Sequence, residues 1–367
     1  MATDIGELTT RVGALSTSSL TVTGKKEAPL PPSGDSDLAL ALAKTKLSIF
    51  RPIKTFGFYG WNPEGGYMDL KDVKVVDIAS KVDPDAKPPK ALSTFLLNRK
   101  LPMTFHNLPA QKHRNKFPYD QTYLTSLYVA SKHRGLETND VDFVLGGSTL
   151  DVLANCHIPN DTTYLAVGVP GTKIVLVAKH KEYMQNYSDP GFQFERFVAG
   201  KRFEDKHDTS IVEHMHLVEV AGHNIFFTAE SDAVDEQGNA IEIRASNPRH
   251  WGTRIGFQMI SNGACSLYAG TKLRRTMLKN VQLQRLETVI GTALHNRDVS
   301  ELEENIASNL DALREAIKSG RFADGTVYEV RFSGYDLQLI PSEYKEGEVL
   351  LPRAEVVKKM LGFSDDE

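Results

Sequence analysis

Four charged residues in two short segments have the types and spacing of a metal-binding site. Glu230 and Asp232 are two positions apart in TAESDAV, and Glu242 and Arg244 are two positions apart in AIEIRAS. Side chains alternate between the two faces of a strand, so the members of each pair are expected to point the same way. If the two strands pair across the turn between them, three carboxylates and one guanidinium converge.

Carboxylates that converge on a half-buried sheet repel one another and raise one another's pKa, and a bound cation removes that penalty. Mg²⁺ or Mn²⁺ is the expected cofactor, because hard cations prefer oxygen ligands. Such ions stabilise the attacking and leaving oxygens of a displacement at phosphorus, which is nuclease chemistry. The structural alternative is that alternating acids mark the solvent face of an antiparallel sheet. Flanking apolar residues such as Phe227, Ile241 and Ile243 favour the buried site.

The segments around these residues predict strands joined by turns, with a few helices. VDFVLGG, TTYLAVGV, TKIVLVAKH, HMHLVEVAG and HNIFFTAESDAV predict strands, and residues 236–239 predict a turn into a further strand, AIEIRAS. Helices are predicted at QTYLTSLYVASKHRG, at PGFQFERFVAGKRFE and at SELEENIASNLDALREAIKSG, the last capped by Ser300. This pattern predicts a single α/β domain with mixed, largely antiparallel sheets flanked by helices, and an active-site cleft that holds the acidic cluster.

Composition limits the class of protein. In 367 residues, 41% are hydrophobic and 25% are charged, which is typical of a globular chain. Residues 1–35 predict a disordered tail, 36–362 the folded domain and 363–367 an acidic tail. The net charge of -4 excludes a chain that is basic throughout, so any contact with nucleic acid needs a local patch. The sequence shows neither a signal peptide nor a long apolar run, which predicts an intracellular protein of the nucleus or cytoplasm, away from membranes.

Two further groups of residues are candidates for binding. His214 and His216 share one strand face, but no third zinc ligand is near them in the sequence, which favours a half-exposed structural pair. The basic segment TKLRRTMLK is ordinarily a solvated face, and beside a nuclease site it could guide an RNA backbone. The basic residues proposed for this contact are Lys272, Arg274 and Arg275.

The order of several short motifs resembles that of the DXO family of decapping exoribonucleases. GFQFE at 191–195, ESD at 230–232 and EIR at 242–244 match Gly-aromatic-x-aromatic-Glu, Glu-x-Asp and Glu-x-Lys, and Gln258 followed by SLYAG is similar to a fourth element. The resemblance implies a role for Gln258 in holding the scissile phosphate or the water. It also implies four metal ligands, with Glu230 binding directly or through water: Glu195, Glu230, Asp232 and Glu242. Glu204 in GKRFED is a rival to Glu195, which is preferred because both of its aromatic positions are filled.

Two positions depart from the family pattern. Arg244 stands where the family has lysine, and arginine is a permanently charged planar fork that suits phosphate binding better than proton transfer. FVLGGST at 143–149 stands where the family has Trp-Arg-Gly, so the arginine of that motif has no clear equivalent. Arg134 or Lys173 could replace it in space.

The resemblance implies metal-dependent hydrolysis at RNA 5′ ends in RNA quality control. The reaction would be decapping of incomplete or non-standard caps, pyrophosphate hydrolysis, or 5′-3′ exoribonuclease activity, on RNA that carries a cap, a triphosphate or a monophosphate. The catalytic set would be Glu230, Asp232, Glu242, Arg244 and Gln258. A first alternative is a degenerate relative that binds and stabilises a 5′-3′ exoribonuclease. A second is a DNA-directed nuclease, which would use the same ligands.

Overall fold

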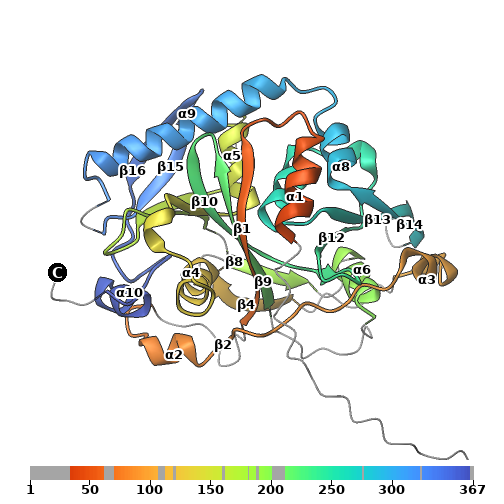
Figure 1. Cartoon of the computed structure of the whole chain (residues 1–367), viewed down its shortest axis with the longest axis horizontal. Helices are drawn as coiled ribbons and strands as arrows, with labels where there is room; N and C mark the ends of the chain where they lie inside the picture. The colour runs from red at the N-terminus through yellow and green to blue at the C-terminus, as the bar shows by residue number, and fades with distance from the viewer. Residues whose placement is uncertain are drawn as a thin grey trace, which may run out of the picture. The chain divides into compact units, whose positions relative to one another are not determined.

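Three β-sheets form the framework of the protein (Figure 1). The computed structural model describes residues 34–61, 70–105, 112–118, 121–158, 162–180, 182–186, 190–200, 211–274, 277–322 and 325–363. These residues belong to one compact unit. The tails predicted at 1–35 and 363–367 lie almost entirely outside the described residues, and the first helix, α1 (Gly34–Ala43), begins at the edge of the first of them.

The largest sheet has nine strands and is mixed. Its strands, in spatial order, are β16 (Asp336–Pro341), β15 (Tyr328–Ser333), β6 (Tyr164–Gly168), β7 (Val175–Lys179), β5 (Phe143–Leu145), β10 (His223–Glu230), β9 (Ile211–Val220), β1 (Phe50–Trp61) and β2 (Val82–Asp83). The pairs that β5 forms with β7 and with β10 are parallel, and the other pairs are antiparallel. The predicted mixed, largely antiparallel architecture is therefore confirmed.

A five-stranded sheet carries the second half of the predicted site. Its order is β11 (Ala233–Val234), β12 (Ala240–Arg244), β13 (Ser266–Arg274), β14 (Met277–Arg285) and β3 (Met103–Thr104). Helix α7 (Thr253–Ser261) connects β12 to β13, which run parallel, so these three elements form a β-α-β unit. A two-stranded sheet pairs β4 (Lys112–Pro118) with β8 (Glu182–Asn186).

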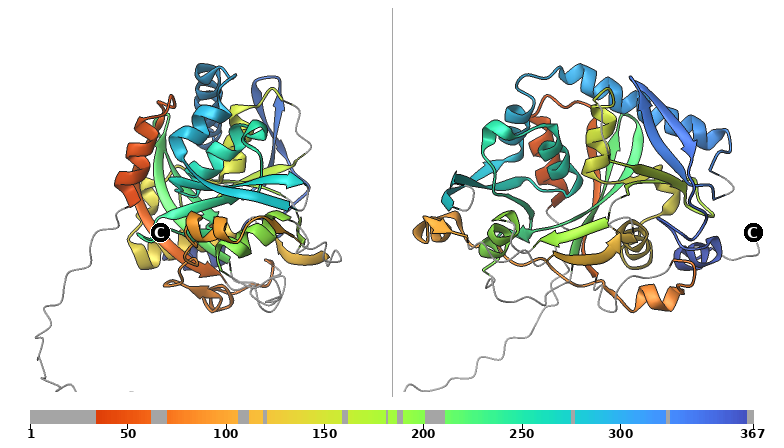
Figure 2. Two further views of the ribbon diagram at one scale, coloured as in Figure 1. Left: turned by 90° about the vertical axis from the view of Figure 1, so that its right-hand side faces the viewer. Right: turned by 180° about the vertical axis from the view of Figure 1, so that it is seen from behind.

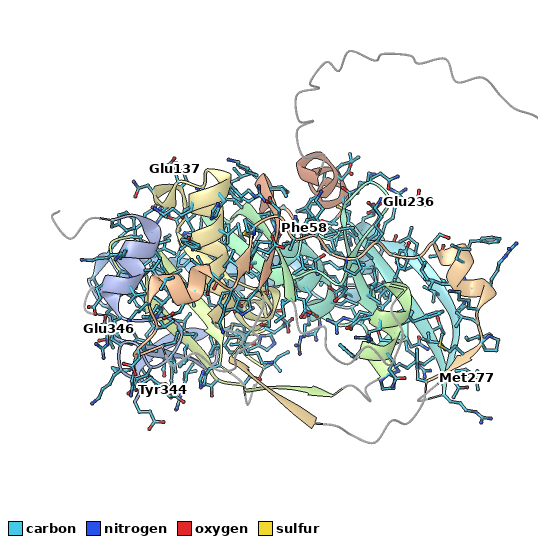
Figure 3. All side chains as sticks on the ribbon, turned by 90° about the horizontal axis from the view of Figure 1, so that it is seen from below. Phe58, Glu137, Glu236, Met277, Tyr344 and Glu346 are labelled. Atoms are coloured by element: carbon cyan, nitrogen blue, oxygen red, sulfur yellow. The ribbon has the colours of Figure 1, made fainter. Side chains whose placement is uncertain are left out.

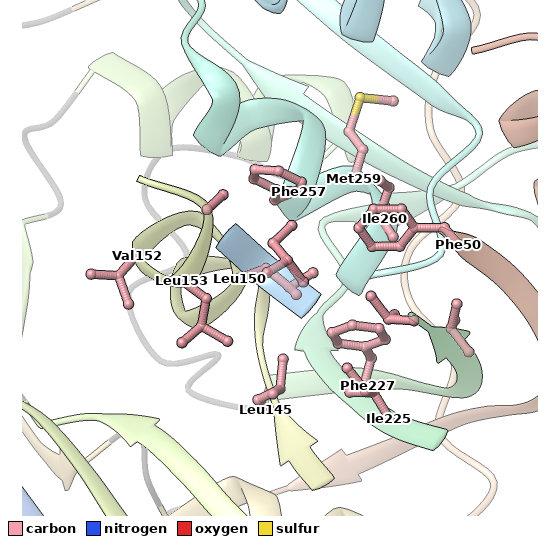
Figure 4. Close-up of a cluster of buried hydrophobic side chains, with 14 of the residues drawn as sticks. Phe50, Leu145, Leu150, Val152, Leu153, Ile225, Phe227, Phe257, Met259 and Ile260 are labelled. Atoms are coloured by element: carbon pink, nitrogen blue, oxygen red, sulfur yellow. The ribbon is translucent and has the colours of Figure 1, made fainter. Parts of the chain in front are cut away.

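Strand alternation divides the interior into separate hydrophobic cores. In β10, Ile225 and Phe227 point to one face of the large sheet, whereas Phe226 points to the other. On the first face, α5 (Gly147–Ala154), α7, α8 (Leu286–Ala293) and α9 (Val299–Lys318) pack over the sheet, and Figure 4 shows Phe257, Met259 and Ile260 of α7 in this core. The second face packs against α2 (Val75–Ala79), α4 (Gln121–Arg134) and α10 (Ala354–Leu361).

The five-stranded sheet also has apolar contacts on both faces. Its Ile241 and Ile243 pack with Phe194 of α6 (Pro190–Val198) and with Leu97 of α3 (Thr94–Arg99), whereas Leu267 and Ala269 belong to the core beneath α7 and α8. Figure 2 shows α9 beside the hairpin of β15 and β16 at the opposite end of the unit from α3. Within the described residues, no helix combines the length and hydropathy that crossing a bilayer requires.

The ends of two predicted helices differ from expectation. Asp298, and not Ser300, caps α9, because its carboxylate accepts hydrogen bonds from the backbone N–H groups of Ser300 and Glu301. Helix α6 ends at Val198, and Gly200 follows with a positive φ that a helix does not continue through. Residues 201–210, which include Glu204, lie outside the described residues.

Candidate active site

Glu230 and Asp232 lie where the chain passes from the large sheet to the five-stranded sheet. Glu230 is the last residue of β10, and the backbone N–H of Ser231 still donates to the carbonyl oxygen of Val212, a residue of β9, at 2.8 Å. Asp232 instead accepts a hydrogen bond from the backbone N–H of Ile243 on β12, at 2.8 Å. The prediction that one hairpin carries both acidic pairs is therefore wrong. The hairpin consists of β11 and β12, and β10 belongs to a different sheet.

Glu242 and Arg244 face α7 and the residue that follows it, and each of these supplies one polar partner. The carboxylate of Glu242 accepts hydrogen bonds from Arg244 Nε at 2.9 Å and from Asn262 Nδ2 at 2.5 Å. Arg244 also donates to the side-chain oxygen of Gln258. Glu242 and Asn262 are buried, whereas Arg244 and Gln258 are partly open to solvent. The structure thus brings the predicted residues Glu242, Arg244 and Gln258 into one hydrogen-bonded group, and it adds Asn262.

The four predicted metal ligands are close enough to influence one another electrostatically. Burial raises the pKa of Asp232 well above its usual value, and neighbouring negative charges raise it further. Those charges belong, in decreasing order of effect, to Glu242, Glu195 and Glu230. Part of Glu230 is exposed to solvent, yet the protein atoms around its carboxyl exclude water and thereby raise its pKa. The negative charge of Glu242 raises this pKa further. The carboxylates thus come from α6, from the end of β10, from the following loop and from β12.

The donor set suits a divalent cation, although the side chains are not arranged as a finished chelate. Four neighbouring carboxylates, of which Glu230 and Asp232 have raised pKa values, are the oxygen-rich, negatively charged surroundings that a hard cation relieves. Among the described residues, however, no three acidic, histidine or cysteine side chains form a ready-made metal site. Arg244 already neutralises part of the charge through its ion pair with Glu242.

Close packing fixes the helices that carry Glu195 and Gln258. Phe194, next to Glu195, lies over Gly270 of β13, where a Cβ atom would come within 3.0 Å of the phenylalanine ring. At the start of α5, a Cβ on Gly147 would lie 2.7 Å from the Cα of Gln258 and 2.5 Å from Ser261 Oγ. Both glycines therefore allow an approach that sets the position of a predicted site residue.

His214 and His216 anchor the end of α7. His214 Nδ1 hydrogen-bonds to Asn262 O and His216 Nε2 to Ile260 O, each at 2.8 Å. Burial, the neighbouring His214 ring and the hydrogen bond to Ile260 together leave the pKa of His216 at about 3, so its imidazole is neutral at physiological pH. The pair is structural, as predicted, but both side chains are buried and the expectation of half-exposure was wrong. They hold the segment from which Asn262 reaches Glu242.

Glu213 is a buried acid beside the site that was missed in the sequence. It lies directly opposite Glu230 in the pairing of β9 with β10, and burial raises its pKa to about 8. Thr228 donates to its carboxyl at 2.9 Å, and hydroxyl contacts continue from Thr228 to Ser126 and Tyr59. The alternation of residues in this strand could have predicted that Glu213 is buried, because Glu213 shares a strand face with Met215 and Leu217, which are buried in the second core.

Two of the basic residues predicted to guide RNA, Lys272 and Arg274, lie at the end of β13. Lys272 is half-buried and Arg274 is exposed, and Arg275 lies outside the described residues. Of the substitutes considered for the missing arginine, Arg134 contacts Pro84 and Asp85, and Lys173 forms an ion pair with Asp142 at 3.0 Å. The described contacts therefore tie both substitutes to residues outside the acidic cluster.

Of the comparisons with known proteins, the comparison of structures found matches and the two comparisons of sequence did not. No family model and no curated protein sequence matches the chain. Scheffersomyces stipitis Rai1 is similar, with a TM-score of 0.59 at 14% identity, over 86% of this chain and 94% of that one. Candida albicans Rai1 in complex with pU5-Mn²⁺ has a TM-score of 0.56 at 11% identity, over 86% and 93%. K. lactis Dxo1 in complex with manganese has a TM-score of 0.53 at 12% identity, over 82% and 91%.

The matched regions make up most of each of those chains and most of this chain, so the similarity is not limited to the acidic cluster. The resemblance to the DXO family noted in the sequence is thus matched by an independent comparison of coordinates. The chain has the fold of the Rai1 and Dxo1 proteins.

Proposed function

We propose that this protein is a divalent-metal-dependent hydrolase that acts at RNA 5′ ends. The observation that carries the proposal is the electrostatic coupling of Glu195, Glu230, Asp232 and Glu242, which come from four separate segments. Support also comes from the fold, since one similar structure is a Rai1 in complex with pU5-Mn²⁺ and another is a Dxo1 in complex with manganese. The reaction would remove incomplete or non-standard caps, hydrolyse a 5′ triphosphate, or release nucleotides from the 5′ end.

Each residue of the site has a role that follows from its surroundings. The four carboxylates would hold Mg²⁺ or Mn²⁺, and such an ion supplies an activated water and neutralises charge at phosphorus. Arg244 is partly open to solvent, and its planar fork can bind a phosphate oxygen pair. Gln258, which accepts from Arg244, can help hold the scissile phosphate or the water. Asn262 keeps the Glu242 carboxylate in place.

The test combines metal binding with turnover. Purified protein is incubated with Mn²⁺ and with 5′-labelled RNAs that bear a triphosphate, an unmethylated cap, NAD or a monophosphate, and matched DNA strands are digested beside them. Calorimetry measures Mn²⁺ binding in the same preparation. The double variant Glu230→Gln with Asp232→Asn should lose both Mn²⁺ binding and product release. Glu236→Gln is the matched control, because Glu236 is an exposed acid in the turn of the same region (Figure 3).

The outcomes separate this function from its rivals. Release of 5′ products by the wild type and by Glu236→Gln, with none from the double variant, supports the proposal. Preference for DNA would assign the site to DNA cleavage, and failure to bind Mn²⁺ would refute the metal site. Turnover that survives in the double variant would show that the acids are structural.

One observation favours a second function, that of a binding partner of a 5′-3′ exoribonuclease. Arg244 replaces the lysine of the motif and is engaged with both Glu242 and Gln258, which leaves no primary amine in the group for proton transfer. Bound Mn²⁺ without turnover on any RNA would support this role. Faster RNA hydrolysis by an added exoribonuclease, in the presence of the protein, would then be the positive result.

A further inference from the structure

A polar pocket lies on the surface where β12 leads into α7, and no residue of the acidic cluster lines it. Its volume is about 520 Å³, and it is formed by the segment from Pro248 to Trp251, the end of α8 and the turn that precedes α9. Pockets that hold small ligands in proteins have volumes of roughly 300 to 1,000 Å³. The space is therefore large enough for a mononucleotide.

The lining of this pocket is basic, although the protein as a whole carries a net charge of -4. Arg249 and Arg297 contribute guanidinium groups from two different segments, His295 adds an imidazole, and no aspartate or glutamate lines the pocket. Within the described residues, neither arginine has a carboxylate within ion-pair distance. Asp298 follows Arg297 directly, but its carboxylate caps α9. Arg249 Nε donates to His250 Nε2 at 3.1 Å, and Arg297 lies within electrostatic reach of Asp151, so it is the remaining guanidinium donors that form a local site for an anion.

The other residues that line the pocket favour nucleotides over inorganic anions. The rings of Trp251 and His295 line the pocket beside the two arginines, and aromatic rings next to cationic side chains are the groups on which nucleobases stack. Inorganic anions would use only the arginines. Arg249 is five residues beyond Arg244, so their Cα atoms are at most about 17 Å apart. An RNA strand bound at the acidic cluster would therefore have this pocket within its reach.

We infer that this pocket binds a nucleoside phosphate, with the phosphate between Arg249 and Arg297 and the base against Trp251 and His295. The ligand is either a free nucleotide or one residue of an RNA strand. Binding here needs no metal ion and no catalysis, so it can be measured whether or not the protein hydrolyses RNA.

The pocket contains its own reporter and a position at which it can be filled. The chain has two tryptophans: Trp61 is fully buried, and Trp251, which is 9% exposed, lines the pocket at one edge of the first core, so ligand binding should change Trp251 fluorescence. Gly291 of α8 lines the pocket too, and a Cβ placed there would meet no atom within 4 Å. Gly291→Gln would therefore extend a side chain into the space, and replacing a helical glycine should keep or raise the melting temperature.

The experiment titrates the full-length protein with AMP, adenosine, inorganic phosphate and a five-nucleotide RNA, in EDTA, while tryptophan fluorescence is recorded. AMP or the RNA should give a saturable change that adenosine does not give. Arg249→Gln and Arg297→Gln should each weaken binding roughly tenfold or more, the loss expected for a charged hydrogen bond. Gly291→Gln should abolish binding, and Arg51→Gln, whose side chain is 74% exposed on β1, is the charge-matched control.

The arms of the experiment distinguish the sources of the phosphate. A response to AMP assigns the pocket to free nucleotides, and a response to the RNA without one to AMP assigns it to a nucleic-acid strand. A response to inorganic phosphate as strong as that to AMP would refute the role of the aromatic rings. No saturable change up to about 5 mM ligand, or a change that persists in Gly291→Gln, would overturn the inference.

Discussion

The buried acid Glu213 should make the protein less stable as the pH rises. Its pKa is about 8 in the folded protein, against an ordinary value of 4.5, because burial disfavours the charged form. Below pH 4.5 the group is neutral in both states and costs nothing. Between pH 4.5 and 8 the unfolded chain ionises it and the folded protein does not, so the free energy of unfolding falls by about 1.4 kcal/mol per pH unit. At pH 7 the accumulated cost is about 3 kcal/mol.

Glu213→Gln removes this cost, since an amide of the same shape can still accept the hydrogen bond from Thr228. Urea unfolding of wild type and variant at several pH values gives the difference in their free energies of unfolding. That difference should grow in favour of the variant by about 3.5 kcal/mol between pH 5 and pH 8. Any effect of the substitution on packing is the same at each pH and therefore cancels when the differences at two pH values are compared. Glu219→Gln, a less buried acid on the same strand, controls for the lost charge. A difference that stays flat with pH would refute the reasoning.

Three further changes test how the site is held. Asn262→Ala removes the donor to Glu242 and should weaken Mn²⁺ binding about tenfold in calorimetry with the melting temperature little changed, whereas unchanged affinity would exclude a positioning role. Arg244→Lys should raise the single-turnover rate of 5′-end hydrolysis if the site lacks an amine that can transfer a proton, and an equal rate would contradict this. Gly147→Ala forces a Cβ against Gln258 and should cost about 1 to 3 kcal/mol in denaturant unfolding, and a neutral result would mean that α5 and α7 can separate without loss.

The strands and the members of the acidic cluster could be predicted because both depend on local patterns. Alternation in HNIFFTAE places Phe226 on one face and Ile225 and Phe227 on the other, and the structure confirms this. The convergence of Glu195 with the other acids came from the order of motifs, since α6 is about 35 residues before Glu230. No spacing rule connects residues that far apart.

The sheet to which each acid belongs could not be predicted in the same way. The spacing of Glu230 and Asp232 in the sequence is the same whether the strand continues through both residues or ends between them. Only tertiary contacts direct Ser231 to the large sheet and Asp232 to β12. Asn262 was missed because a lone asparagine after a helix is typical of a helix end, and its contact with Glu242 depends on the β-α-β connection. Glu213 was missed because acids are rarely buried, so the pattern that pointed it inward was given too little weight.

The guanidinium of Arg244 occupies the place of a counterion that the protein carries itself. A metal ion at Glu242 would compete with Arg244 for the negative charge of the same carboxylate, so weakening of this ion pair would offset part of the free energy of metal binding. A phosphate that draws Arg244 outward releases the same carboxylate and should tighten the hold on the ion. By reciprocity the ion should then favour the phosphate to the same degree. In an enzyme of this kind, the reaction centre would be fully charged and ordered only when metal ion and substrate are both bound.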